Sequence, residues 1–174
     1  MAPGVPWVER AWAFDFPAAL HPQILERLRG TPARLEDLLR GLASNVLTRR
    51  EGESWSIQEN AGHLIDTEFL PWMRLDELLA RAEVLSAADM SNRKSDEADH
   101  NARDLGQLLA ELRTERARLV ARFESLEPID FELSARHPRL ERTMRVVDLC
   151  LFHAEHDDHH LARITELKRR FGAA

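Results

Sequence analysis

The chain has 174 residues, of which 44% are hydrophobic and 31% are charged. This length and composition are typical of one globular domain with a core of its own. The formal net charge of −6 argues against nonspecific binding of nucleic acid, which needs a basic surface, and no apolar run is long enough to cross a bilayer.

The single cysteine and the first residues of the chain bear on the cellular compartment. Cys150 cannot form an internal disulfide, which fits a reducing compartment, and its apolar neighbours predict an inert core thiol. Residues 1–12 lack the basic region and the continuous apolar stretch of a signal peptide. We therefore expect a cytoplasmic protein with neither a membrane nor a nucleic acid as its partner.

The N-terminal part is expected to form an arm and two helices. Residues 1–22 contain prolines and aromatic residues, which predicts an irregular arm that packs its rings on the body. A short helix is expected over residues 23–29, ended by Gly30. Thr31 and Pro32 then predict the start of a new helix, because threonine is a good N-cap and proline suits the first helical position.

Three longer helices follow along the chain. Ser56 and Glu59 have the spacing of a capping box, which predicts a helix from there to about Glu83 with a kink at Pro71. Two more helices are expected over residues 105–126 and 146–171, with long connections over residues 86–100 and 127–142. No segment of useful length alternates with period two. The sequence therefore predicts an all-α four-helix bundle over residues 23–172, with metal sites between facing helices.

The last helix carries histidines on a face that should be apolar. Spacings of three and four place one set of residues on this face: Leu149, His153, His156, His160, Ile164, Leu167 and Phe171. The set begins and ends in large apolar residues, so burial is expected, and unpaired polar groups are costly in a core. Neutral imidazoles at positions i and i+4, such as His156 and His160, can bind one divalent cation together.

A metal site needs at least one further protein ligand, and His63 is the candidate. It lies in the middle of a predicted helix, and its neighbours on the same helical face are polar: Glu59, Asn60, Asp66 and Thr67. This pattern predicts a polar cavity. Because Gly62 has no side chain, a ligand in this cavity could approach the helix backbone closely. Two simpler interpretations stay open from the residues alone, namely hydrogen-bonded core histidines and a solvated helix face.

Other polar residues near the histidines allow more than one interpretation. Three interpretations are open for His153: a metal ligand, a hydrogen-bond partner of a metal ligand, or part of a cavity wall. Asp157 and Asp158 either orient an imidazole through its second nitrogen or belong to a charged helix surface, which is favoured for Asp158. The remaining histidines are expected at the surface: His21, His100, His137 and His159. For His137, which precedes Pro138 in a predicted turn, a position over a pocket is the alternative. The sequence lacks the P-loop, the dinucleotide-binding fingerprint, the nucleophile elbow, the His-Glu-x-x-His motif and the ferritin-like Glu-x-x-His pair.

Three stretches are similar to one known family. Residues 54–64 read Ser-Trp-Ser-Ile-Gln-Glu-Asn-Ala-Gly-His-Leu and are followed by an acidic residue, Glu68. Residues 156–164 begin with a His-x-x-His-His motif, and residues 28–39 are also similar. Over about residues 24–170 the sequence resembles the DinB/YfiT-like superfamily of damage-inducible bundle proteins.

The resemblance implies an up-down-down-up bundle with a divalent metal ion bound by His63, His156 and His160. Nickel and zinc are the typical metals, and iron, manganese and copper also suit histidine ligands. His153 matches no ligand of the family. Homodimers are common among its members, so a homodimer is expected.

Some members of this family use low-molecular-weight thiols, which indicates a metal-dependent thiol S-transferase acting on an electrophile, or a related hydrolase or isomerase. Three histidines leave an open coordination position, and a thiol bound there would lose its proton and become nucleophilic. The sequence shows no nucleophile of its own, and its catalytic residues are not assigned. The alternative is a non-catalytic metal-binding module of a stress response.

Overall fold

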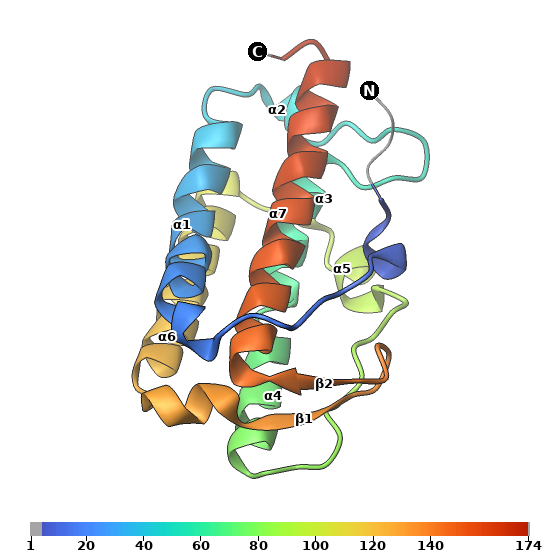
Figure 1. Cartoon of the computed structure of the whole chain (residues 1–174). Coiled ribbons are helices and arrows are strands. Elements are labelled where there is room, and N and C mark those ends of the chain that lie inside the picture. The colour runs from blue at the N-terminus through green and yellow to red at the C-terminus, as the bar shows by residue number, and fades with distance from the viewer. Residues whose placement is uncertain (1–4, 174) are drawn as a thin grey trace.

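Four long helical segments lie side by side in the computed structural model, which describes residues 5–173 (Figure 1). They are α1 (His21–Leu39), α3 with α4 (Ile57–Asp66 and Phe69–Leu79), α6 (Leu105–Glu124) and α7 (Val146–Arg170). Figure 1 shows α1 and α7 running in one direction and α3–α4 and α6 in the other. The predicted up-down-down-up four-helix bundle is therefore confirmed.

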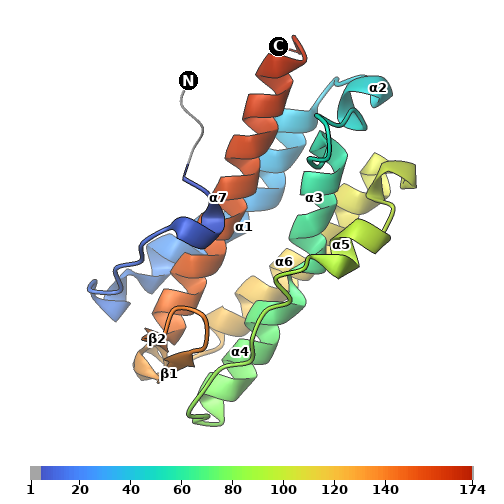
Figure 2. The ribbon, with the colours of Figure 1, turned by 90° about the vertical axis from the view of Figure 1, so that its right-hand side faces the viewer.

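Short elements complete the chain. They are η1 (Trp7–Glu9), η2 (Ala18–Leu20), α2 (Ser44–Leu47), α5 (Arg93–Glu97), η3 (His100–Ala102), η4 (Pro128–Glu132), β1 (Ser134–His137) and β2 (Arg142–Arg145). Figure 2 shows the segment after α4 running back along α4 to α5, which lies beside α3, while the arm crosses α7 on another side. Trp7 and Trp12 of the arm pack their rings on Phe152 of α7, at 4.9 and 4.6 Å between centroids. Within residues 5–173, no helix has both the length and the apolar character needed to span a bilayer.

The expected break at Gly30 is wrong, because α1 continues from His21 to Leu39 with Pro32 inside it. A proline cannot donate a backbone hydrogen bond to the carbonyl four residues earlier, here that of Leu28. This carbonyl instead accepts a hydrogen bond of 3.0 Å from Nη1 of Arg116 on α6. Thr31 is likewise no helix cap: it is buried, and its hydroxyl donates to Asp157 at 2.7 Å.

The helix predicted from Ser56 to about Glu83 is interrupted at residues 67–68 and ends at Leu79. The capping box is confirmed, because Ser56 Oγ accepts from the Glu59 backbone and Glu59 accepts from the Ser56 backbone. The interruption fits the effect expected of Pro71: a proline cannot donate to the carbonyl four residues earlier, here that of Thr67, which instead accepts from the Leu70 backbone at 3.1 Å in a tighter turn.

A small hairpin occupies the second long connection. β1 and β2 pair in antiparallel register, from Ser134 opposite Arg145 to His137 opposite Arg142. The segment after α4 joins β1 through a parallel bridge between Val84 and Arg136: the Leu85 N–H donates to the Arg136 carbonyl at 3.0 Å, and the Arg136 N–H donates to the Glu83 carbonyl at 2.9 Å. β1 alternates between solvent and core, so His137 faces inward and is 2% exposed, which makes its expected surface position wrong.

Candidate metal centre

The predicted ligands come together between α3 and α7. His63, His156 and His160 each offer a ring nitrogen, and these three atoms lie within 4.8 Å of one another. The Nε2 atoms of His63 and His156 are 3.3 Å apart. His156 and His160 lie one turn apart on α7, and His63 faces them from α3. The structure therefore brings together the set predicted from the sequence, while its role as a ligand set stays a prediction.

Asn60 fixes the orientation of the His160 ring. The Asn60 amide nitrogen donates to the Ser56 carbonyl at 2.8 Å, which turns its oxygen toward His160. His160 Nδ1 is 3.0 Å from that oxygen and therefore carries the proton that it donates. The lone pair of His160 is then on Nε2, the atom that a metal ion would need.

A chain of hydrogen bonds fixes His63 in the same tautomer. Ser95 of α5 donates its hydroxyl proton to Asp66 at 2.7 Å, so its oxygen accepts from His63 Nδ1 at 2.8 Å. Asp66 also accepts from His100 Nε2 at 2.8 Å. A carboxylate behind a histidine ligand raises the basicity of the ring, here through the serine. His63 therefore presents its Nε2 lone pair to the centre.

His100 is 1% exposed, so its expected surface position is wrong. Its ring packs on the backbone of Gly62, where an added Cβ would lie 2.2 Å from His100 Cγ. A glycine is therefore needed at position 62, because the His100 ring fills the space that any larger side chain would need.

The three rings fit a divalent cation. Burial lowers the pKa of His63 to about 4 and the pKa values of His156 and His160 well below the usual 6.5. All three are thus neutral near pH 7, which is the form that binds metals. In addition, His156 Nδ1 is buried without a hydrogen-bond partner in the described part of the chain. Two Nε2 atoms facing each other at 3.3 Å are a natural pair of ligands for one cation.

A buried charged network lies beside the centre. Arg116 forms ion pairs with Glu68 and Asp157, and its Nη2 lies 3.2 Å from His153 Nε2. Burial alone would raise the pKa of Asp157, but the Arg116 guanidinium lowers it to about 2. The Asp157 carboxylate therefore accepts hydrogen bonds from Arg116 and Thr31, and within residues 5–173 it accepts none from a histidine. Asp158 pairs with Arg27 and Arg34 of α1 as part of the helix surface.

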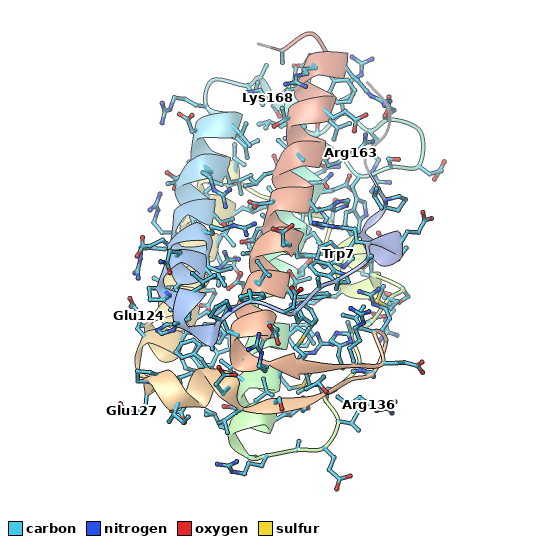
Figure 3. All side chains as sticks on the ribbon, viewed as in Figure 1. Trp7, Glu124, Glu127, Arg136, Arg163 and Lys168 are labelled. Carbon is cyan, nitrogen blue, oxygen red and sulfur yellow. The ribbon has the colours of Figure 1, made fainter. Side chains whose placement is uncertain are left out.

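A cavity of about 770 Å³ opens over the histidines. The Trp55 ring lies 4.6 Å from His63 and the Trp7 ring 5.2 Å from His156, measured between centroids. Figure 3 shows Trp7 of the arm beside α7. His159, expected to be exposed, also lines the cavity and is half-buried, with its ring 6.0 Å from Trp7.

The family model of the DinB superfamily matches residues 27–164, a span that includes all three histidines. The chain belongs to the DinB superfamily. YfiT from Bacillus subtilis, described as a probable metal-dependent hydrolase with an unusual four-helix bundle topology, superposes with a TM-score of 0.81 over 95% of both chains at 21% identity. A Streptococcus pneumoniae protein matches with a TM-score of 0.65 and 12% identity over 92% of this chain and 93% of its own. At such identities the likeness shows the DinB fold alone. No curated protein matches the sequence.

Several residues of this DinB centre were missed by sequence reasoning. Ser95 and His100 lie in a polar segment with no periodic pattern, so nothing local pointed to a role beside His63. Arg116 lies on the inner face of α6 among leucines, and an arginine at a core position was the available signal. Asn60 was recognised as part of a polar stripe, but its hydrogen bond to His160 depends on the packing of α3 on α7.

Proposed function

We propose that this DinB protein is a metal-dependent enzyme that activates a small nucleophile from solution for attack on a small molecule bound in the cavity. One observation carries the proposal: three neutral imidazoles, two of them held in a fixed tautomer by Asn60 and Ser95, converge on the wall of a cavity of about 770 Å³. This volume is in the range of small-molecule binding sites.

His63, His156 and His160 would hold a divalent cation, for which nickel and zinc are the first candidates. A cation bound there would act as a Lewis acid and lower the pKa of a water molecule or thiol that it binds. Three protein ligands are typical of catalytic rather than structural sites. Asn60 and Ser95 would keep the rings oriented, and Trp7 and Trp55 would limit the access of water.

The nucleophile is proposed to come from solution, because the one cysteine is unsuited to the role. Cys150 is fully buried in the hydrophobic core, and burial raises its pKa well above the usual value. A thiol kept protonated and away from the cavity is not nucleophilic. Water would give a hydrolase, as described for YfiT, and a low-molecular-weight thiol would give an S-transferase, as the family resemblance implies.

The test starts with metal content. Elemental analysis of untagged protein should find about one divalent ion per chain in the wild type, and a loss in His63→Ala and His160→Ala. His21→Ala is the matched control, because His21 stacks on Phe131 at 3.9 Å and does not line the cavity. A wild-type chain that takes up no metal on titration would refute the proposal.

The second step is activity of the metal-loaded chain. Small esters, amides and lactones test hydrolysis, and chlorodinitrobenzene with glutathione, cysteine or other cellular thiols tests S-transfer. Turnover that disappears with a chelator and in His63→Ala supports an enzyme and tells which nucleophile it uses. Tight metal binding without turnover in any of these assays would instead support the non-catalytic metal-binding module.

A further inference from the structure

We propose that the end of the cavity between α4 and the hairpin is an anion site, in which Arg74, His137 and Arg139 bind a carboxylate or phosphate group. Arg74 lies on α4, His137 ends β1, and Arg139 lies in the turn between the strands. All three line the same cavity as the candidate metal ligands. As a statement about the substrate, the inference rests on the proposed function: the reacting group would lie at the histidines and the anionic group at this end.

Arg74 is a buried cation without a carboxylate partner. It is 1% exposed, and its Nε and Nη2 donate to the neutral carbonyl of Ser86 at 3.1 and 2.9 Å. No carboxylate of residues 5–173 forms an ion pair with it; the nearby Glu77 carboxylate accepts hydrogen bonds from Ser86 instead. Burial lowers its pKa to about 10, which still leaves it charged near pH 7. A buried charge is costly unless it is paired, so an anion in the cavity would complete its surroundings.

Arg116 provides a comparison within the same chain. It is also 1% exposed, but it forms ion pairs with two carboxylates, those of Glu68 and Asp157. The fold therefore supplies partners for the arginine that has a structural role. Arg74, by contrast, faces a cavity that a ligand can enter.

His137 adds a neutral donor at this end. The Leu140 backbone donates to His137 Nδ1 at 3.2 Å, so the ring proton is on Nε2. This buried N–H group finds no acceptor anywhere in the described structure, although the residue is 2% exposed. Burial, together with the positive charges of Arg74 and Arg139, lowers its pKa to about 4 and keeps the ring neutral. An anion would accept the unused proton.

Arg139 supplies a second positive charge. It is half-buried, and its Nη1 donates a hydrogen bond of 3.4 Å to the Val8 carbonyl of the arm. Two carboxylates also line the cavity, but both belong to exposed residues: Asp89 is held by Ser91, and Glu53 lies after the turn at Gly52. The third arginine of the cavity, Arg163, is paired with Glu51 and Glu166.

The walls between the two ends are apolar and constrain the rest of the ligand. They include Leu70 and Pro71 from α4 and Leu149 and Phe152 from α7. The substrate class that fits this arrangement is a small molecule with an apolar body, an anionic group at one end and an electrophilic group at the other. A free acid and a phosphate monoester share this chemistry.

Binding to the full chain after chelator treatment tests the anion site without the metal. Phenylacetate and phenyl phosphate are titrated calorimetrically near pH 7, with neutral phenylacetamide as the reference ligand. At least one acid should bind about tenfold more tightly than the amide, and the stronger acid shows which anionic group the site takes. Equal binding of all three, or tighter binding of the amide, would overturn the proposal.

The Arg139→Ala variant tests where the anion binds. Arg139 is a half-buried turn residue, so loss of its side chain leaves no cavity in the core. The variant should weaken binding of the acid about tenfold and leave the amide unaffected. Arg136→Ala is the matched control, since Arg136 lies two residues before Pro138, on the solvent side of β1, and is labelled in Figure 3. Equal effects of the two variants would also overturn the proposal. The binding experiment contains no metal. A failure to bind the anion would therefore refute this inference alone, whereas a failure of hydrolysis and S-transfer in the metal-loaded chain would refute the proposed function.

Discussion

Replacement of Gly62 by alanine should destabilise the protein, although alanine is the better helix former. The added Cβ would lie 2.2–2.5 Å from three ring atoms of His100. That ring cannot move aside freely, because it is 1% exposed and bonded to Asp66 at 2.8 Å. Overpacking of this kind costs about 1–3 kcal/mol, and loss of a hydrogen bond to a charged group about 1.5–3 kcal/mol. The gain in helix propensity offsets about 1 kcal/mol, so a net loss of about 1.5–5 kcal/mol is expected.

Urea unfolding followed by circular dichroism measures this change, and Gly30→Ala is its control. Gly30 is also a helical glycine, but no atom lies within 4 Å of its added Cβ. It should therefore gain about 0.5–1 kcal/mol from helix propensity alone. The reasoning about His100 is refuted if Gly62→Ala unfolds at the same urea concentration as the wild type or at a higher one.

Three further predictions concern the site and its surroundings. Ser95→Ala should weaken metal binding about 10–100-fold in a competition titration with a chromogenic chelator, because His63 loses the partner that orients it, and unchanged affinity would contradict this role. Arg116→Met should lower the free energy of unfolding by about 3–5 kcal/mol in urea, since two buried carboxylates and the Leu28 carbonyl lose their partner; a loss below about 1 kcal/mol would contradict it. The third concerns pH: His137 is neutral in the fold and has a pKa of about 4, so its contribution to stability is complete above about pH 6.5 and is lost as pH falls toward 4. Between pH 7 and 5 the chelator-treated wild type should therefore lose about 1–2 kcal/mol more stability than His137→Gln, and equal losses would show that His137 is not the group responsible.

The helices whose signals are local were predicted well from the sequence. The apolar stripes of α6 and α7 and the Ser56 capping box determine elements that the structure shows at nearly the same residues. The histidines of the candidate centre were found for the same reason, since His156 and His160 share a helix face whatever the rest of the chain does.

The features that were missed depend on partners far away in the sequence. Gly30 and Pro32 end a helix unless something satisfies the Leu28 carbonyl, and its partner Arg116 is 88 residues away. The hairpin strands have four residues each, too few to give a periodic pattern. His100 and His137 lie in polar segments, and their burial follows from contacts with Asp66 and from the hairpin register.

The guanidinium of Arg116 links all four long segments of the bundle. It lies on α6 and bonds to the Leu28 carbonyl of α1, to Asp157 of α7 and to Glu68 between α3 and α4. If α6, α7 or the α3–α4 segment detached, a charged group in the protein interior would lose an ion-pair partner, and if α1 detached, Arg116 would lose the Leu28 carbonyl. Partial unfolding therefore carries much of the cost of complete unfolding. Amide protons of all four long helices should consequently exchange with solvent through the same global opening.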